Sequence, residues 1–303
     1  MLTLLQFFEQ SGQAAQIAVA RIIERYAKLA PILPIRSLGH LVHLYNRETS
    51  LGEVGRRAVN QPAPDSAPGN TSPVNDPLIM LTRKIKTDHR LAQLDPNARG
   101  TEAQRGTRAI ARVMDDAIIN DNRMDNIDNL LGLKQRCVGS QLIETATNGA
   151  TLTVEHVEAA LDAVQDQGSG KMLVMSRPAY RQLVADVRSN AGGATVADVT
   201  SEIPVYEGAK IVIIGDKLDG TSILGFTETQ GSNAETCSAL VIAPGNDEVE
   251  LSGVKLLMAS NSIELIDEGT RDSMKIDVLE IAFGIAVYDD TAIARIKGIA
   301  KAA

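Results

Sequence analysis

The residues best suited to chemistry in this chain occur in patterns that each lack a necessary partner. His40 and His43 have the spacing of a metal-binding pair, but no Glu or third ligand accompanies them as in HExxH helices. The stretch QDQGSGKM, residues 165–172, approaches a phosphate-binding loop, yet Gln165 replaces its first Gly and Met172 replaces its Ser or Thr. We therefore expect a helix-to-strand turn there, and no metal or nucleotide cofactor.

The acidic pairs are equally poor candidates for general acid–base catalysis. The pairs at 115–116 and 289–290 are adjacent aspartates, and neighbouring side chains on a helix or strand diverge. The sequence contains no GxSxG nucleophile elbow and no dinucleotide-binding GxGxxG. The sequence therefore predicts no catalytic site.

Composition argues against charge-driven nucleic-acid recognition and against a membrane location. The 303 residues include 30 basic and 38 acidic side chains, a formal net charge of -8, and only 3% aromatic residues. Phosphate neutralisation needs a basic face, and base stacking needs aromatic rings. No apolar run is long enough to span a membrane, and no basic segment precedes the apolar N-terminus as in a signal peptide. Cys137 and Cys237 lack CxxC spacing, so we expect two buried thiols in a reducing compartment.

The elements that would position functional residues begin with an amphipathic helix in the first 30 residues. Pro31 and Pro34 end it. Its apolar face consists of Ile17, Ile22, Ile23, Tyr26 and Leu29. This face either covers its own domain or serves as an arm that docks on a neighbour.

Residues 38–60 and 78–95 predict two strands joined by a proline-rich tip. The tip, QPAPDSAPGNTSPVNDP at 61–77, contains five prolines. Neither strand is apolar enough to be buried on both of its faces, which indicates a hairpin that projects from the body. At about 3.3 Å per residue, arms of some 20 residues reach on the order of 60 Å.

Residues 101–122 predict a long helix with Thr101 as its N-cap. Its buried stripe consists of Ile110, Val113, Met114, Ala117 and Ile118. Arg105, Arg108 and Arg112 line another face. Either this face is solvated or it docks acidic groups of another subunit.

From Thr153 onward the pattern is α/β. Helices are expected after Thr153 and after Ser176, and a Gly/Ala-rich loop is expected at 191–201. Strands are expected at 171–175, 209–214, 222–228 and 238–243, with short β runs over 248–266. Residues 274–288 predict one long closing strand. Its change of apolar phase indicates a bulge or burial on both faces, and Gly284 indicates a close backbone approach.

This order of elements resembles the major capsid proteins of tailed bacteriophages, whose Hong Kong 97 type capsid fold is shared with encapsulins. KMLVMSRPAYRQLVADVRS is similar to the family's strand, turn and helix, and VYEGAKIVIIGDKL to its strand leading into an Asp-containing turn. VLEIAFGIAVYDDTAIARIKGI resembles its C-terminal block. The resemblance implies an α+β fold with an N-terminal arm (1–37), an extended β-hairpin loop (38–92), a peripheral domain with a long spine helix (93–136 and 253–288) and an axial domain (137–252 and 289–303).

The resemblance also implies a structural protein and no enzyme. The expected function is a major capsid protein that self-assembles into hexamers and pentamers of an icosahedral shell enclosing phage double-stranded DNA. The expected location is the virion, with assembly in the host bacterial cytoplasm. Implied partners are other copies, a separate scaffolding protein, a portal, a terminase, an optional decoration protein, and packaged DNA contacted weakly on the inner surface. An encapsulin-like nanocompartment shell around a protein cargo is the alternative, and an α/β enzyme with unrecognised catalytic residues is the third possibility.

Charged residues of the loop and the long helix are the expected inter-subunit contacts: Arg47, Glu48, Glu53, Arg56, Arg57, Arg105, Arg108 and Arg112. Some relatives join subunits covalently through a loop lysine, but residues 38–82 contain no Lys, so this crosslink is not expected. The start at Met1 leaves no room for a scaffolding domain ahead of the arm, so scaffolding is expected from a separate protein.

Overall fold

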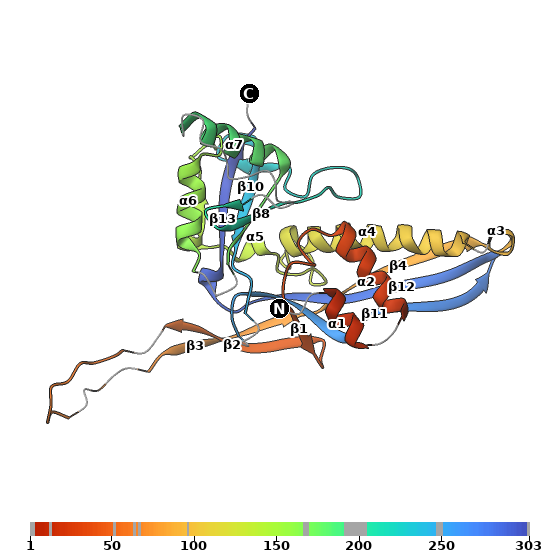
Figure 1. The fold of residues 1–303 in the computed structure, drawn as a ribbon, viewed down its shortest axis with the longest axis horizontal. Helices are drawn as coiled ribbons and strands as arrows, with labels where there is room; N and C mark the ends of the chain where they lie inside the picture. Colours follow the sequence, from red (N-terminus) through yellow and green to blue (C-terminus); the bar gives the residue numbers. More distant parts are fainter. Residues whose placement is uncertain are drawn as a thin grey trace.

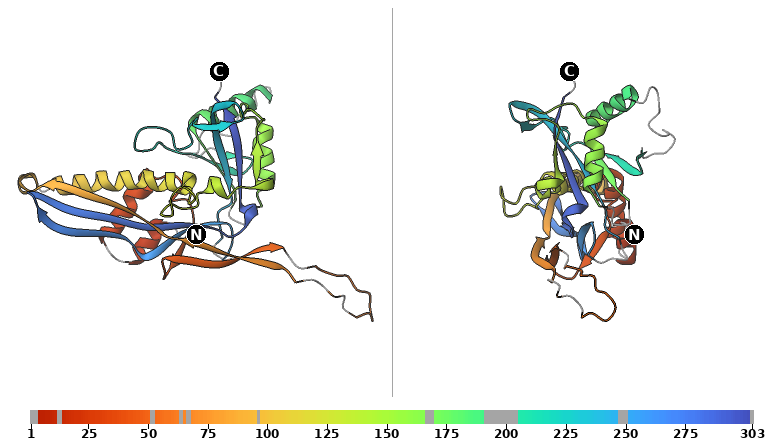
Figure 2. Two further views of the ribbon diagram at one scale, coloured as in Figure 1. Left: turned by 180° about the vertical axis from the view of Figure 1, so that it is seen from behind. Right: turned by 90° about the vertical axis from the view of Figure 1, so that its left-hand side faces the viewer.

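We describe a computed structural model of the chain over residues 4–11, 14–50, 53–62, 65, 68–95, 97–165, 170–190, 205–246 and 251–301. An elongated four-stranded sheet lies along one long helix, and a second unit stands on the end of that helix (Figure 1). A two-stranded hairpin leaves the body in the direction opposite to the elongated sheet, and the view from behind shows the same arrangement (Figure 2). The molecule is therefore far longer than a compact domain would be.

Two helices, α1 (Leu4–Ser11) and α2 (Ala14–Tyr26), replace the single N-terminal helix that the sequence predicted. Leu4, Phe8 and Ile23 are fully buried in the main core, and α2 lies against the long helix α4 (Ala98–Asn120) (Figure 1). Full burial of such a side chain stabilises the fold by about 1.5–3 kcal/mol. Of the predicted apolar face, Ile23 and Leu29 are buried, while Ile17, Ile22 and Tyr26 are half-buried, so α2 packs on its own chain through part of that face.

The elongated sheet has the strand order β1-β11-β12-β4. The central strands β11 (Val254–Arg271) and β12 (Met274–Val287) form a long hairpin that turns at Asp272 and Ser273, both with positive φ. This pair of conformations matches the right-handed twist of the flanking strands. The outer strands are β1 (Ile35–Leu38), parallel to β11, and β4 (Ile79–Asp88), antiparallel to β12.

Strand β12 confirms the predicted long closing strand, and it is buried on both faces. Ile281, Phe283 and Ile285 enter the main core, while Ala286 joins a second cluster beneath the hairpin. The register shifts occur on β11, whose breaks in alternation explain why residues 248–266 were wrongly predicted to form several short runs. A Cβ at Gly284 would lie 2.9 Å from the carbonyl oxygen of Pro77, which confirms the predicted close approach.

The projecting hairpin pairs β2 (Val42–Ser50) with β3 (Asn70–Pro77). The predicted second arm was therefore wrong: β4 belongs to the elongated sheet, and β3 comes from the proline-rich segment expected to form the tip. Pro73 and Pro77 are tolerated because β3 is an edge strand that needs few of its N–H groups. Alternation in β4 buries Ile85 and Thr87 while its charged residues face solvent.

Helix α4 begins earlier than predicted. Asn97 holds the N-cap position, and Thr101 lies inside the helix, so the N-cap prediction was wrong. The side chain of Arg99, in the first turn, donates to Asp277 of β12 across 2.7 Å, which ties the start of α4 to the sheet. The helix α3 (His89–Leu94) connects β4 to α4.

The second unit is built around a seven-stranded sheet ordered β5-β13-β10-β6-β8-β7, with β9 paired to β10. Its strands are β5 (Leu142–Glu144), β6 (Met172–Met175), β7 (Val205–Tyr206), β8 (Ala209–Ile213), β9 (Glu228–Gln230), β10 (Asn233–Ile242) and β13 (Ile293–Ala300). Helices α6 (Val154–Ala163) and α7 (Arg177–Asn190) accompany this sheet (Figure 2). The final strand β13 returns the chain to this sheet after β12, pairing with β10 and β5.

The segment after β8 differs from the predicted one. The strand expected at 222–228 is wrong, because Ser222 pairs only with Asp216 and the following residues form turns before β9. The Gly/Ala-rich loop expected at 191–201 lies outside the described residues, as do residues 166–169 of the tested phosphate-loop motif. Gly170, with φ of 76°, leads directly into β6.

Candidate assembly site

The histidine pair does not form a metal site. His43 is buried, stacks on Tyr45 at a ring distance of 5.1 Å and hydrogen-bonds the Tyr288 hydroxyl through Nε2 at 2.9 Å. His40 is exposed. In the part of the chain that the structure describes, no group of three His, Cys, Asp or Glu side chains is placed to hold a metal ion.

The four paired aspartates all have structural partners. Asp115 is buried and accepts hydrogen bonds from the amides of Lys28, Leu29 and Ala30 at 2.5, 3.2 and 3.1 Å. Burial raises the pKa of Asp115 to about 6, although these amides favour the charged form. The carboxylate therefore fixes the chain after α2 onto α4.

The other three acids are used in the same way. Asp116 pairs with Lys217 at 3.2 Å, and Asp289 accepts from the amide of Thr291 at 2.9 Å. Asp290 forms an ion pair with Arg47 at 2.6 Å. Neither adjacent pair presents two carboxyl groups to a common point.

Both cysteines are buried free thiols, as the sequence predicted. Burial raises the pKa of the Cys137 thiol to about 12, and burial likewise raises the pKa of Cys237 to about 12. A thiol needs a lowered pKa to act as a nucleophile near neutral pH. These side chains fill the core.

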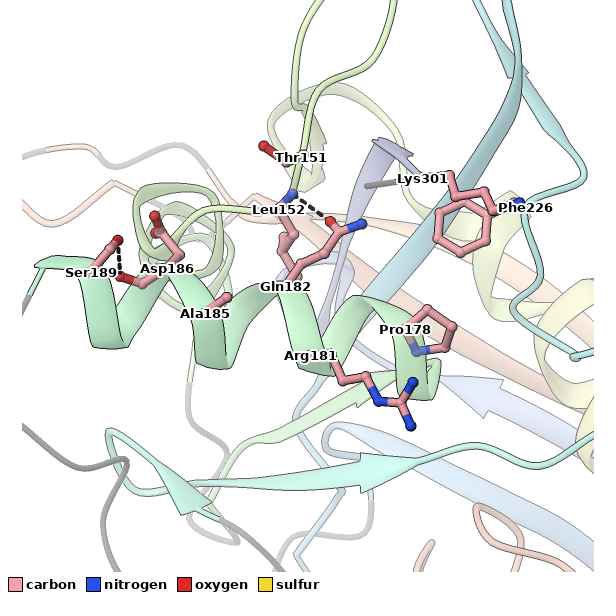
Figure 3. A pocket seen from close by; sticks show the side chains of 10 residues that line it. All are labelled: Thr151, Leu152, Pro178, Arg181, Gln182, Ala185, Asp186, Ser189, Phe226 and Lys301. Carbon is pink, nitrogen blue, oxygen red and sulfur yellow. Dashed lines mark hydrogen bonds between the residues drawn. The ribbon is translucent and has the colours of Figure 1, made fainter. Parts of the chain in front are cut away.

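A hollow of about 590 Å³ lies along α7 (Figure 3). Its central polar group, Gln182, accepts from the Leu152 amide at 2.9 Å and donates to the Ala300 carbonyl at 2.8 Å. Asp186 accepts from the amide of Val154 at 2.7 Å. These groups hold the ends of α6 and β13, so the hollow offers no free acid–base pair.

The root of the projecting hairpin is fixed by a buried polar network. Arg136, at the end of α5 (Leu133–Arg136), donates to both oxygens of Asp76 on β3 at 2.7 and 3.2 Å. The Tyr45 hydroxyl donates to Asp76 at 3.0 Å and also lies 2.8 Å from the Val287 carbonyl. Burial, followed by the charge of Asp76, raises the pKa of Tyr45 far above its usual range. The direction of the hairpin is thus set by buried bonds to α5 and β12.

The other end of α5 is bonded to the seven-stranded unit. Lys134 pairs with Glu228 of β9 at 2.5 Å, and Arg295 of β13 pairs with the same carboxylate at 2.7 Å. Burial alone would raise the pKa of Glu228, but these two cations outweigh burial and lower it. Sequence reasoning missed this network because its members lie far apart in the chain and each looks like an ordinary surface charge.

The far part of the hairpin contrasts with its buried root. Residues 53–62 are exposed throughout, including Glu53, Arg56 and Arg57, and the side chain of Arg57 donates to the Gln61 carbonyl at 3.1 Å. Val54 and Val59 are 93% and 89% exposed. Both apolar side chains are thus left uncovered by the described parts of their own chain.

Two predicted contact residues lie closer to the body. Arg47 forms an ion pair with Asp290 of its own chain at 2.6 Å, and its role across an interface stays a prediction. The backbone of Glu48 lies in β2 opposite Thr71, and its side chain falls outside the description.

Of the predicted arginine row of α4, Arg108 contacts Tyr26 of α2. Arg105 pairs with Glu102 at 2.5 Å, and both are exposed. The guanidinium of Arg108 lies 4.8 Å from the centre of the Tyr26 ring. Arg112 is exposed.

No helix of the described chain is long and apolar enough to cross a membrane.

Comparisons with known proteins identify the fold through structure alone. No protein-family model matches the chain. No curated protein matches it in sequence. The capsid of a native GTA particle is similar over 91% of this chain and 91% of its own, with a TM-score of 0.66 and 16% identity. The SrpI encapsulin of Synechococcus elongatus is similar over 90% of this chain and 87% of its own (TM-score 0.64, 14% identity).

A protein of Mycobacterium phage Bobi is similar over 91% of this chain and 89% of its own, with a TM-score of 0.59 and 13% identity. Each alignment spans about nine-tenths of both chains. The chain therefore has the Hong Kong 97 type capsid fold, an α+β fold found in phage capsids and encapsulin shells.

Proposed function

We propose that this chain is a major capsid protein that self-assembles through hexamers and pentamers into an icosahedral shell around double-stranded DNA. The observation that carries the proposal is the hairpin β2–β3, which has a buried polar root and a tip exposed over residues 53–62. A segment anchored this firmly and left uncovered at its end is suited to contact another copy. Closed shells are built from such repeated heterologous contacts.

The structural role also accounts for the chemistry-bearing residues. His43, Asp115, Asp116 and Gln182 each bind a group of their own chain. We therefore propose that the protein is not an enzyme. The acidic net charge of -8 suits the inner surface of a shell, because packaged DNA must slide along most of that surface.

We propose a division into four parts that follows the strand pairing. The arm is 1–37, and the extended loop is the hairpin β2–β3 with its tip. The peripheral domain contains α4, β11 and β12 together with β4, and the axial domain contains residues 137–252 and 289–303. This division differs from the expected one only in moving β4 out of the loop.

The inter-subunit contacts of the loop are proposed to be Glu53, Arg56 and Arg57, together with Val54 and Val59. All five are exposed. The charged residues would fix how two copies align. Each of the two valines would stabilise the contact by about 1.5–3 kcal/mol when fully covered.

We further propose assembly in a host bacterial cytoplasm into a virion, with a separate scaffolding protein, a portal and an optional decoration protein as partners. The similarity to an encapsulin, with a TM-score of 0.64, supports the second candidate, a nanocompartment shell around a protein cargo. Both candidates share the shell and differ in its contents.

Electron microscopy and sedimentation of the purified protein test the proposal. Closed icosahedral particles, formed alone or with a scaffolding partner, are the expected result, and nucleic acid inside particles isolated from the native source distinguishes a virion from a protein-filled compartment. A monomer or dimer that never assembles, at high concentration or with scaffold present, would overturn the shell proposal.

A further inference from the structure

Six exposed cations lie on or next to the packed helices α2 and α4, and we call this group the basic face. This basic face consists of Arg21, Arg25, Lys28, Arg105, Arg108 and Arg112, all of which are exposed. The composition predicts no such concentration, because the cations come from two segments about 80 residues apart. The packing of α2 against α4 brings them together (Figure 1).

Three of these cations have no carboxylate partner among the described residues. Arg25, Arg108 and Arg112 take part in no ion pair there, whereas Arg99, Arg136 and Lys84 of neighbouring elements are all paired. Arg105 and Arg21 have only exposed acidic neighbours, Glu102 and Glu9. Exposed pairs of this kind contribute about 0–1 kcal/mol and exchange readily for a stronger anion.

The side chain of Tyr26 organises the centre of the face. Its ring lies 4.8 Å from the guanidinium carbon of Arg108 and 5.9 Å from that of Arg25. Both contacts are within the range of cation–π attraction. Two like charges are thus held beside one ring, in positions where an added anion could bind both.

We infer that the α2–α4 basic face binds the phosphodiester backbone of double-stranded DNA, and, resting on the proposed function, that this face is turned toward the packaged DNA. Five of the six cations are arginines, which bind phosphate oxygens through two parallel hydrogen bonds. Arg105 and Arg112 are separated by about 10 Å along the helix axis, at 1.5 Å per residue. Phosphates of one DNA strand recur about every 3.4 Å along the duplex axis, so the row spans about three of them.

An acidic face of a second copy is the competing partner, and the structure favours it less. The acidic side chains Asp267, Asp277 and Glu268 of the elongated sheet are already neutralised within the chain. A phosphate backbone presents a continuous row of uncompensated charge, which suits exposed arginines that have no carboxylate partner among the described residues or, like Arg105, only an exposed one.

The test measures binding of the unassembled full-length protein to a labelled 30-base-pair duplex over a series of NaCl concentrations. Each phosphate contact contributes about 0.9 to the slope of log affinity against log salt. Replacing Arg25, Arg108 and Arg112 with Gln is expected to reduce that slope by about 2 to 3. The matched Lys variant, which keeps the three charges, is expected to retain the slope.

The control removes three exposed arginines elsewhere, through Arg90→Gln, Arg188→Gln and Arg271→Gln, and is expected to leave the slope unchanged. Equal losses in both triple variants, or no binding by the wild-type protein, would overturn the inference. So would a Gln variant of the face that binds DNA normally but no longer forms shells, since that result assigns the face to a neighbouring subunit. Loss of slope in a protein that never forms shells would support the basic face and contradict the proposed function, so the two failures are distinguishable.

Discussion

At the scale of single residues, the most consequential side chains are buried charges that hold separate parts of the fold together. Asp76, Asp115 and Glu228 each accept several hydrogen bonds from other elements. A buried charge that loses its partner costs about 3–5 kcal/mol, whereas an exposed pair contributes about 0–1 kcal/mol. These residues therefore matter for stability far more than their polar character suggests.

Asp76→Asn is expected to lower the free energy of unfolding of the unassembled subunit by about 3–5 kcal/mol, because Arg136 keeps its charge in a buried site. Urea denaturation measures the change. Arg47→Gln, which breaks a partly exposed pair with Asp290, is the control and is expected to cost about 1 kcal/mol or less. A loss for Asp76→Asn no larger than that of the control would show that the network does not hold the root.

Asp115 gives the subunit a stability that depends on pH. Its pKa of about 6 in the folded protein exceeds the ordinary value of 3.8, so the folded state binds the proton more readily than the unfolded state. The contribution of Asp115 is therefore fully present below about pH 4 and is lost as pH rises through 6, by at most about 3 kcal/mol.

Asp115→Asn removes this titration, so the wild-type free energy of unfolding minus that of the variant is expected to fall between pH 4 and pH 7. Denaturation at several pH values measures this difference, in which the other titrating groups cancel. A difference that stays constant across the range would contradict the assignment.

At the scale of elements, the sequence predicted best where one periodicity ran uninterrupted. The apolar residues of β12 and the stripe of α4 identified both elements, because burial alone determines their pattern. The segment at 222–228 failed because apolar residues there fill the core from turns, as Ile223 and Leu224 do. Strand β3 was missed because its prolines argue against a strand unless the strand is known to lie at an edge, and that knowledge requires the tertiary fold.

The need to know the tertiary fold also limits what the sequence predicts about the assembly site. The exposed tip could be predicted from composition, since its prolines and charges cannot form a core. The root could not be predicted, because Asp76 and Arg136 are 60 residues apart in sequence and only the packed fold brings them together. The basic face required the α2–α4 packing in the same way.

Phe283→Asp tests the central position of β12. An unpaired carboxylate in the main core is expected to prevent folding, because Phe283 is fully buried. Met80→Asp is the matched control: Met80 lies on the neighbouring strand β4 and is 58% exposed, so folded protein is expected. The measurement is the yield of folded subunit by circular dichroism and sedimentation. Normal folding of the Phe283 variant would show that β12 is not core.

At the scale of the whole molecule, folding and assembly should be separable. The hairpin tip contributes no residue to either core cluster, while the root is bonded to the body. The molecule thus combines a body with its own core and an exposed segment that, under the proposed function, would contact another copy.

Deleting residues 53–67 tests this separation. Residues 51, 52, 68 and 69 remain to connect β2 to β3, and hairpin loops of this length are common. The subunit is expected to keep its free energy of unfolding within about 1 kcal/mol, because none of the described residues in the deleted range belongs to a core cluster. Shells seen by electron microscopy are expected to be few or incomplete. Normal shells would exclude the tip as an assembly contact.

The two ends of α5 give the molecule a mechanical property. Lys134 is bonded to the seven-stranded unit and Arg136 to the hairpin root, with one residue between them. A rotation of one unit is therefore transmitted through less than one helical turn to the other. Because β2 extends about 17 Å from Tyr45 to Ser50 at about 3.3 Å per residue, a tilt of about 10° at the root moves its end by about 3 Å. A small rotation at the root is therefore amplified along the hairpin, and the angle of the hairpin would change with the local curvature of a shell.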